Sequence, residues 1–297
     1  MRVVSLLPAA TEIVAALGGA IGAPVGADTS SGPALVGISH ECDFPPEVGV
    51  LPRVTRTTLD GSLSSSGIDR ALAAARASRT PPITIDVAAL AALRPDAIIG
   101  QAVCDVCAVG ADELGRALQA LSFTPVVVTL HAHTLEAVFD DIRKVGDALE
   151  LAPEADELVA GMRYRLHRIQ ERQPSKTTHN APRTLVLEWL DPPYVAGHWV
   201  PELVAIAGGA DVGNIPGARS VPRAWPDLLA LAPECVIVAL CGFGLARARQ
   251  EVAGLRDAEA VRLLSRGVEF LDGNAYTSRP GPRLVDAAER LAALIPG

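Results

Sequence analysis

Short apolar runs alternate with amphipathic stretches along most of the chain. Apolar residues at 3–7 predict a strand, and residues 11–17 predict a helix that Gly18 and Gly19 end. Further apolar runs stand in "PDAIIG", "TPVVVTLHAH", "TLVLEWL" and "ECVIVALC". Because continuous apolar strands that alternate with helices are typical of parallel sheets covered on both faces, we expect an α/β fold.

One helical pattern is longer than the others. Between residues 134 and 173, apolar residues recur at helical spacing, from Leu135 and Val138 to Leu166 and Ile169. The motif "ELAPEA" indicates a break, because Pro153 can occupy the first turn of a new helix. We therefore predict an N-terminal α/β lobe at 1–133, a connecting backbone helix at 134–173 and a C-terminal α/β lobe at 174–297.

The two lobes resemble each other in sequence. "ALRPDAIIGQAVC" and "ALAPECVIVALC" share a helix end, a proline, an acidic residue, an apolar strand and a final cysteine. Each lobe also contains a strand–loop–helix unit that ends in a double glycine. The sequence therefore predicts two Rossmann-like lobes with the same plan.

Polar, aromatic and thiol residues gather in the loops that follow the predicted strands. In the first lobe these loops include "SHECDFP" at 39–45, Cys104 to Cys107, His131 and His133. In the second lobe they include 188–194, His198 with Trp199, 241–243 and 274–283. Because ligands of α/β sheets bind at the carboxyl ends of the strands, we expect these loops to line one cleft if the lobes face each other.

Composition narrows the class of protein. The chain has 297 residues, 49% of them hydrophobic and 20% charged, which is typical of a globular protein. Its net charge of −8 argues against nucleic acid or an anionic membrane as a partner. Glu12 interrupts the apolar N-terminus, and no run has the roughly 18 apolar residues of a membrane span. We therefore expect a cytoplasmic chain without membrane insertion, whose five cysteines are thiols or ligands.

Four cysteines fall at predicted strand ends, whereas Cys235 falls within a strand. With nearby imidazoles they could bind zinc, iron or copper. The candidate metal ligands are Cys42, Cys104, Cys107, Cys241, His40 and His198. Two other interpretations stay open. The cysteines could simply fill small buried sites, or "CDVC" could be a redox pair at a helix start, although Asp105 would oppose thiolate formation.

Aromatic residues are few but fall mostly in the same loops. Together they suit a large flat or amphipathic ligand, which apolar walls and a few polar groups would hold. The candidates are Trp189, Tyr194, Trp199, Trp225 and Tyr276. No glycine-rich phosphate loop, GxSxG or HExxH motif is present in the sequence, so the pattern favours a binding protein and leaves enzymatic activity open.

Six blocks of the chain resemble a known family. They are "VVSLLPAATEIVAALGG", "VGISHECDFPPEV", "ALRPDAIIG", "WLDPPYVAG", "LAPECVIVA" and "SRPGPRLVDAAERL". In order and spacing, from about residue 2 to 294, they are similar to the vitamin B12 and iron-chelate substrate-binding proteins of ABC importers, and most to the cobalamin branch. The resemblance implies the class III periplasmic-binding-protein fold, in which one long backbone helix joins two lobes and a metal chelate lies between them.

The resemblance also implies which side chains touch a corrinoid. Family positions that contact the ligand fall on Phe44, Tyr194, Trp225, Tyr276 and Arg279. The resemblance does not extend to an export signal, and the acidic residue that docks the first lobe on a permease falls near Ala88, with Asp227 a loose counterpart in the second. These departures leave transport through a permease open. The motif "HECD" and the strand-end cysteines resemble a cytoplasmic subgroup of the family.

The leading hypothesis is a binding protein for cobalamin or a related metal chelate, with a thiol or an imidazole as a cobalt ligand. Two alternatives remain at this point. The strand-end cysteines could hold zinc or an iron–sulfur centre directly, in a metal-site protein or metalloenzyme, or Cys107 could serve a thiol oxidoreductase.

Overall fold

The computed structural model describes residues 1–23, 26, 32–101, 109–173 and 180–296. It divides into two compact units. The first unit consists of Met1–Gly61, Arg70–Ala132 and Glu136–Ala160. The second consists of Ser62–Asp69, His133–Leu135 and Gly161–Gly297. Two short pieces of chain, Ser62–Asp69 and His133–Leu135, thus belong to the second unit although the residues on both sides of them belong to the first.

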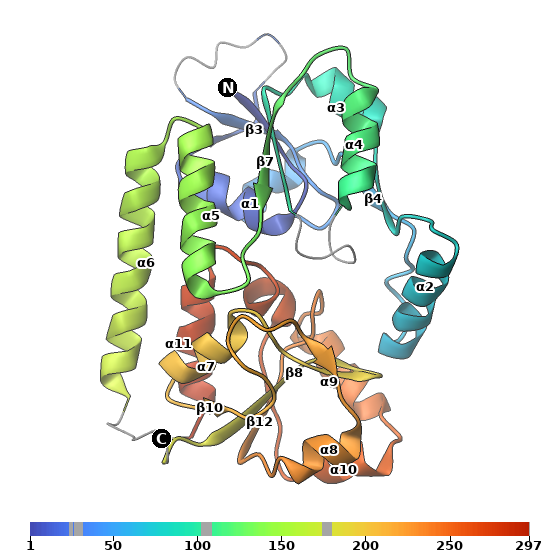
Figure 1. Ribbon diagram of the computed structural model, residues 1–297, viewed down its shortest axis with the longest axis vertical. Helices are drawn as coiled ribbons and strands as arrows, with labels where there is room; N and C mark the ends of the chain where they lie inside the picture. Colours follow the sequence, from blue (N-terminus) through green and yellow to red (C-terminus); the bar gives the residue numbers. More distant parts are fainter. Residues whose placement is uncertain (24–25, 27–31, 102–108, 174–179, 297) are drawn as a thin grey trace. The chain divides into compact units, whose positions relative to one another are not determined.

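A parallel sheet forms the centre of the first unit (Figure 1). Its order is β2–β3–β1–β6–β7, and every pairing in it is parallel, as predicted. The strands are β1 (Arg2–Ser5), β2 (Ala20–Ile21), β3 (Ala34–Gly37), β6 (Ala97–Gln101) and β7 (Val126–Leu130). The other elements are α1 (Pro8–Ala16), η1 (Pro46–Val50), β4 (Thr55–Thr57), α2 (Ser65–Ala77), β5 (Ile83–Ile85), α3 (Val87–Leu93) and α4 (Ala111–Gln119). The first turn of α2 belongs to the second unit.

The second unit has a mixed sheet around β8. Its strands are β8 (Arg183–Leu190), β9 (Pro193–Val195), β10 (Ala210–Asp211), β11 (Val221–Pro222), β12 (Cys235–Val238) and β13 (Glu269–Phe270). Strands β10, β8, β12 and β13 pair in parallel, whereas β9 pairs antiparallel with β8 on one side and with β11 on the other. The reason is the connection at 191–192, since so short a turn can only return the chain antiparallel to β8.

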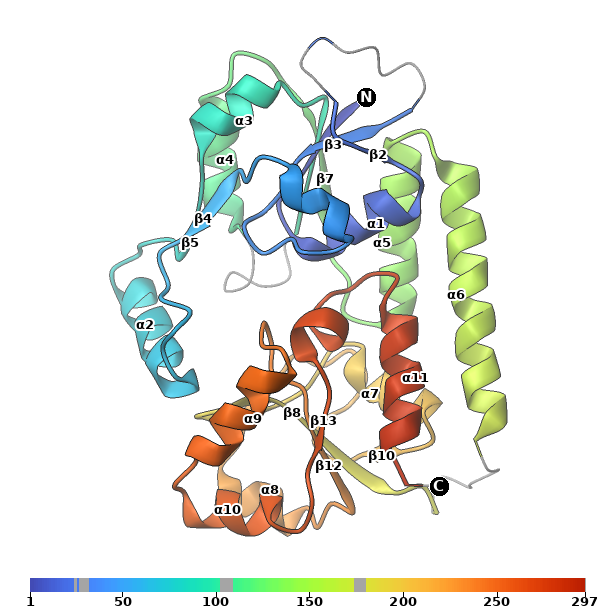
Figure 2. The ribbon, with the colours of Figure 1, turned by 180° about the vertical axis from the view of Figure 1, so that it is seen from behind.

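Helices surround this second sheet (Figure 2). They are α7 (Val200–Ile206), α8 (Trp225–Ala230), α9 (Leu245–Gly254), α10 (Ala258–Leu264), the single-turn η2 (Gly273–Thr277) and α11 (Leu284–Leu294). Leu187, Val238 and Leu240 are fully buried in a core cluster with Leu228 and Leu263. Among the described residues, no helix is both long enough and apolar enough to cross a membrane.

The double glycine predicted to end a helix in each lobe has the same role in both units. Gly18 follows α1 with φ 84°, and Gly208 follows α7 with φ 89°, a left-handed conformation that favours glycine. A Cβ on the second glycine would lie 2.7 Å from the Val14 side chain at Gly19, and 2.7 Å from Thr184 Oγ1 at Gly209. Each pair therefore combines a helix stop with a close approach to the preceding elements.

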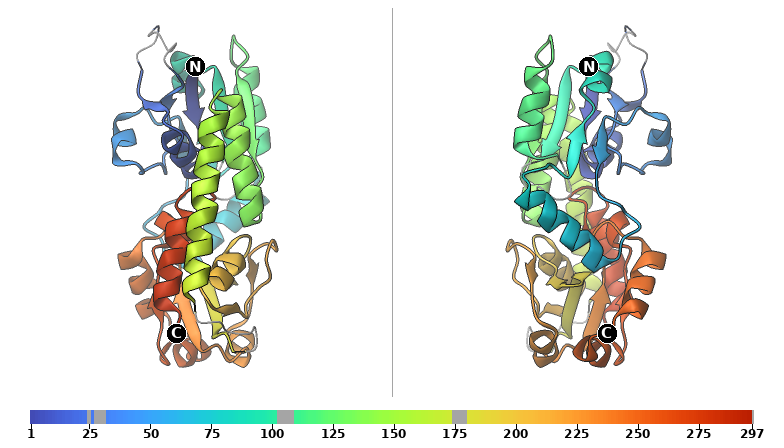
Figure 3. Two further views of the ribbon diagram at one scale, coloured as in Figure 1. Left: turned by 90° about the vertical axis from the view of Figure 1, so that its left-hand side faces the viewer. Right: turned by 90° about the vertical axis from the view of Figure 1, so that its right-hand side faces the viewer.

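The segment at 134–173 contains two helices, with the break where the sequence indicates it. α5 (Leu135–Ala148) and α6 (Ala152–Arg172) are separated by Glu150, whose φ is 60°. They lie side by side and antiparallel in Figures 1 and 2, with Arg143 Nε 3.0 Å from Asp156 Oδ1. α6 is the long helix that passes from the first unit into the second at residue 161. In the second unit it lies beside α11, where Arg165 binds Asp286 and Glu289 (Figure 3).

A buried carboxylate follows β10. Asp211 Oδ1 accepts hydrogen bonds from the backbone N–H groups of Gly213 and Asn214, at 2.8 and 3.0 Å. Its Oδ2 is buried and accepts no hydrogen bond from the described residues. Burial raises the pKa of Asp211 from 3.8 to about 6, even though the two backbone hydrogen bonds act in the opposite direction.

Asp211 therefore makes stability depend on pH. Because its folded pKa exceeds its unfolded pKa, ionisation opposes folding, and this group lowers stability as the pH rises from about 4 to about 6. Asp211→Asn keeps the acceptor for both N–H groups and removes the charge. We expect the variant to melt a few degrees higher than the wild type at pH 7.5, a gain of at most about 3 kcal/mol.

Thermal melts at several pH values check this expectation. The gain should shrink below pH 5, where the wild-type carboxyl is protonated. Asp227→Asn, at an exposed position of α8, is the control and should show no such pH-dependent gain. Equal melting temperatures for the wild type and Asp211→Asn at pH 7.5 would contradict the burial argument.

Candidate ligand-binding site in the second unit

The loops at the carboxyl ends of the second sheet are tied together by backbone hydrogen bonds. Cys241 N–H donates to the Glu188 carbonyl at 2.9 Å, so the loop after β12 runs beside the end of β8. Asn274 N–H donates to the Phe243 carbonyl at 3.2 Å and joins η2 to the same loop. The Trp199 Nε1–H donates to the Thr277 carbonyl at 2.9 Å. Loops that are far apart in the sequence therefore form one edge, as the strand-end argument predicts.

Gly273 allows η2 to lie very close to the backbone that follows β12. A Cβ at this position would overlap the carbonyl oxygen of Leu240 and would lie 2.6 Å from the carbonyl carbon of Ala239. Both atoms belong to backbone directly after β12, which cannot move without disturbing the sheet. The absence of a side chain at 273 therefore fixes η2 against the end of β12.

Two of the predicted aromatic residues are neighbours across the β8–β9 hairpin. Trp189 pairs with Tyr194, so their side chains lie on the same face of the sheet. The Trp189 ring centroid is 5.2 Å from that of Phe243, in a tilted arrangement. The Arg247 guanidinium lies 4.9 Å above the Phe243 ring. Phe243 was included in the sequence analysis only as part of its loop, because a lone phenylalanine gives no signal of its partners.

A hollow of about 890 Å³ lies within the second unit and contains Trp225. Its apolar lining comes from the β8–β9 turn, the start of α8 and the end of α9. These residues are Leu190, Pro192, Pro193, Trp225, Pro226 and Leu255. Trp225 is 7% exposed and also packs into the core cluster, so the hollow has a rigid aromatic side chain in its wall.

The polar lining of the hollow is balanced in charge. Arg223, Arg247 and Arg256 face the same hollow as Asp191, Glu251 and Asp257. Ser62, Ser64, Ser66 and Gln250 add neutral donors and acceptors. An equal number of positive and negative groups gives no reason for this hollow to select a strongly charged ligand. Among all the residues that line the hollow, only Trp225 is a ligand contact predicted from the sequence.

His198 lies beside another imidazole. Its Nδ1 is 2.9 Å from Nδ1 of His133, and its ring stacks on Trp199 at a centroid distance of 5.5 Å. Burial lowers the pKa of His198, and the nearby His133 and Arg219 lower it further. Trp199 is 6% exposed with its N–H bonded to Thr277, so it packs inside the unit.

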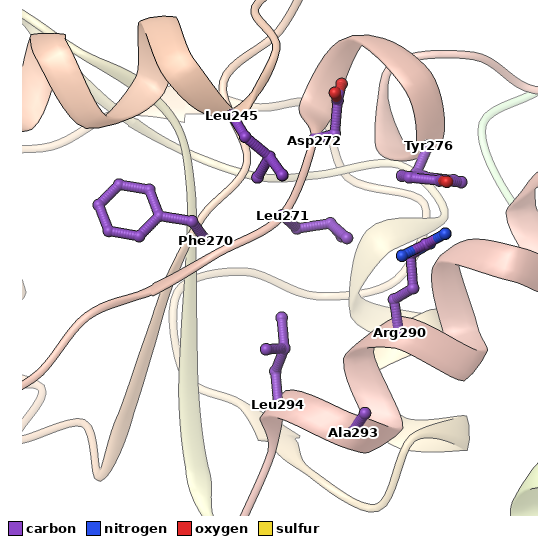
Figure 4. A pocket seen from close by; sticks show the side chains of 8 residues that line it. All are labelled: Leu245, Phe270, Leu271, Asp272, Tyr276, Arg290, Ala293 and Leu294. Carbon is purple, nitrogen blue, oxygen red and sulfur yellow. The ribbon is translucent and has the colours of Figure 1, made fainter.

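Tyr276 and Arg279 lie on the η2 loop but not in the hollow around Trp225. The Tyr276 ring borders a separate pocket of about 180 Å³, between β13, α9 and α11 (Figure 4). Arg290 and Arg283 lie 4.4 and 4.9 Å from its ring centroid. Arg279 is 3% exposed, and its guanidinium donates to Asn274 Oδ1 at 2.9 Å. Tyr276 thus lines a different pocket from Trp225, and the contact of Tyr276 and Arg279 with a ligand stays a prediction.

His40 and Cys42 lie in a turn of the first unit that Arg53 holds. Its guanidinium donates to the carbonyls of Ser39, His40 and Cys42 at 3.0, 2.7 and 3.2 Å. His40 Nδ1 is 2.7 Å from Thr55 Oγ1, and burial and then the charge of Arg53 lower the pKa of His40. Cys42 is 1% exposed with its sulfur 3.0 Å from Thr11 Oγ1. Phe44, two residues further on, is 40% exposed.

Metal coordination by the predicted cysteines and histidines stays a prediction. Cys104 and Cys107 lie outside the described residues. In the described part of the chain, no group of three or more His, Cys, Asp or Glu side chains could hold a metal ion. Cys42 and Cys235 are buried, and Cys241 is half-buried. Burial, and then the charge of Glu269, raise the pKa of Cys235 to about 11, which suits a packing role.

Comparisons with known proteins agree with this architecture. A heme-binding periplasmic protein from Pseudomonas aeruginosa is 23% identical, with a TM-score of 0.69 over 100% of this chain and 93% of that one. The vitamin B12 binding protein BtuF of Vibrio cholerae is 21% identical, with a TM-score of 0.63 over 99% and 95%. The heme-binding RhuT from Roseiflexus sp. RS-1 is 22% identical, with a TM-score of 0.64 over 99% and 97%. Among curated proteins, no significant match is found.

The fold and its connecting helix α6 define a class III periplasmic binding protein. The family model for periplasmic binding proteins matches residues 3–254, so the chain belongs to that family. The structural likenesses, at 21 to 23% identity, show a shared fold.

Replacing Gly273 should disturb the site edge. We expect Gly273→Ala to destabilise the protein by about 1–3 kcal/mol, because the added Cβ overlaps backbone rather than a flexible side chain. Chemical denaturation of the purified variant measures this loss. Gly254→Ala, at the end of α9 with open space around the new Cβ, is the matched control and should be neutral or slightly stabilising. Equal stability of the two variants would contradict the packing argument.

Proposed function

We propose that the protein binds a metal chelate, in particular cobalamin or a related corrinoid, and that the Trp225 hollow receives part of this ligand. Membership of the periplasmic binding protein family supports a binding function. Similar structures are described as binding heme or vitamin B12, which supports a metal-bearing macrocycle as the ligand class.

The hollow itself is the observation that carries the proposal. Its volume of about 890 Å³ lies within the usual range of small-molecule sites, roughly 300–1,000 Å³. Trp225 and the prolines at 192, 193 and 226 offer apolar surface on which the edge of a macrocycle can pack. The serines, Gln250 and the charged residues supply polar partners around that surface.

The balanced charges favour a corrinoid over a porphyrin. Amide side chains of a corrinoid both donate and accept hydrogen bonds, and so suit a mixed lining of arginines, carboxylates and serines. A porphyrin with two carboxylates would place negative charge near Asp191, Glu251 and Asp257 as well as near the arginines. We therefore expect cobalamin to bind more tightly than heme.

Titration of the purified protein with hydroxocobalamin, and separately with hemin, tests the proposal. We expect saturable binding of one equivalent of hydroxocobalamin by calorimetry, with a shifted cobalamin spectrum if a protein side chain coordinates cobalt. Tighter binding of hemin would overturn the corrinoid as the ligand but would still support a metal chelate as the class of ligand. No heat and no spectral change with either compound would overturn both.

Trp225 should contribute strongly to this affinity. We expect Trp225→Ala to weaken hydroxocobalamin binding by about tenfold or more, because buried tryptophans are frequent energetic centres of binding sites. Trp225→Phe should lose less affinity for hydroxocobalamin than Trp225→Ala. Circular dichroism checks that both variants fold. Tyr164→Ala removes an aromatic side chain that is 65% exposed on α6 and is the control. Unchanged affinity in a folded Trp225→Ala protein would exclude the hollow as the binding site.

A further inference from the structure

One wall of the hollow comes from a remote part of the sequence. Residues 58–82 leave β4 and return to β5, and they carry the helix α2 (Figure 2). Within this excursion, Ser62–Asp69 belong to the second unit. Ser62, Ser64 and Ser66 line the hollow together with residues of α8, α9 and the β8–β9 turn. All the other lining residues lie beyond position 189, so the 62–66 turn is the part of the lining that comes from a distant segment of the sequence.

Glu251 on α9 holds this turn. Its Oε2 accepts a hydrogen bond from Ser65 N–H at 3.0 Å and another from Ser65 Oγ–H at 2.6 Å. Its Oε1 accepts from Arg247 Nε at 2.8 Å. Both carboxylate oxygens of a single side chain are thus used, one for the turn and one for a neighbour on its own helix.

Arg247 completes the connection. One turn before Glu251 on α9, its guanidinium donates to the carbonyl of Leu63 and also lies over the Phe243 ring. Because the planar guanidinium has several donors in a fixed geometry, Arg247 can bind Glu251 and Leu63 together. The turn is therefore attached at two backbone positions, the Leu63 carbonyl and the Ser65 N–H.

The charge of Glu251 suits its position. Ser65 is the first residue of α2, so its N–H has no partner within the helix, and a carboxylate at a helix N-terminus is favourable. Burial alone would raise the pKa of Glu251, but the hydrogen bonds from Ser65 and Arg247 outweigh burial and lower it. The carboxylate is accordingly ionised at neutral pH and accepts all three hydrogen bonds.

We propose that the 62–66 turn is a specificity-determining wall of the ligand site and that Glu251 is the positioning residue that holds it there. The serine hydroxyls of this wall would bind carbonyl oxygens of amide groups on the ligand. This ligand contact rests on the proposed function, whereas the attachment of the turn to α9 does not. Glu251 acts through Ser65, and no contact between Glu251 and the ligand is required.

Hydrogen–deuterium exchange of the ligand-free protein tests the attachment. We expect the peptide that covers residues 62–69 to exchange about tenfold faster in Glu251→Ala than in the wild type. Ser65→Ala keeps the backbone N–H donor and should show a smaller effect, and Glu251→Gln should lie between. Glu259→Ala, which removes an exposed partner of Arg262 on α10, is the control and should leave this peptide unchanged. Faster exchange throughout the second unit of Glu251→Ala, or no change at 62–69, would overturn the attachment.

Binding measurements on the same variants test the contact with the ligand. We expect Glu251→Ala to weaken hydroxocobalamin binding severalfold without a matching loss of thermal stability. Ser66→Ala, which leaves the Ser64 acceptor of the Gly67 N–H in place, should weaken binding without faster exchange at 62–69. Wild-type affinity in both would overturn the specificity role. If no chelate binds the wild type, the proposed function and this ligand contact fail, and the exchange experiment still decides the attachment.

Discussion

The pairing of β8 with β12 is the constraint on which the candidate site depends. Four residue pairs, from Thr184 with Cys235 to Leu187 with Val238, align the two strands in parallel. Hydrogen bonds from Ala239 to Leu187 and from Cys241 to Glu188 continue this register past the end of β12. Trp189 on β8 and the start of the loop that carries Phe243 therefore lie at fixed places. The hollow beside them is built on the same frame, since Leu190 is both the last residue of β8 and part of its lining.

Arginine side chains fix many of the loops around the two sheets. Arg2 donates to the carbonyls of Leu93 and Ala23, and Arg183 to those of Leu231 and Ala232. Arg53 holds the 39–42 turn in the same manner. A guanidinium can satisfy several carbonyls at once, which a lysine ammonium does with less geometric definition. Arginine greatly outnumbers lysine in this chain, and these three arginines bind backbone carbonyls that would otherwise lack a partner of such defined geometry.

The sequence predicted the sheets and their helices because burial leaves a periodic pattern. The double glycines, the break near Pro153 and the strand ends were all visible in that pattern. The direction in which each loop side chain points could not be predicted, because it depends on tertiary contacts that the hydrophobic pattern does not contain. Trp199 and Tyr276 carry the same aromatic signal as Trp225, yet Trp199 packs beneath η2 and Tyr276 lies between two arginines. The hairpin after β8 was missed for a similar reason, since Pro192 and Pro193 mark a turn without specifying the strand that follows.

Contacts between residues that are far apart in the sequence are the second feature that the sequence pattern could not predict. Ser65 and Glu251 are 186 positions apart, and neither stands in a motif that indicates the other. The stretch "DGSLSSSG" marks an exposed turn, and Arg247 with Glu251 marks an ordinary i,i+4 ion pair on a helix. Only the tertiary fold turns these two commonplace features into one wall of a hollow. A ligand site assembled in this way can change its polar lining through substitutions at 62–66 while the sheet that carries Trp225 stays intact. In the proposed ligand site, selectivity among chelates would therefore depend on the turn separately from the sheet.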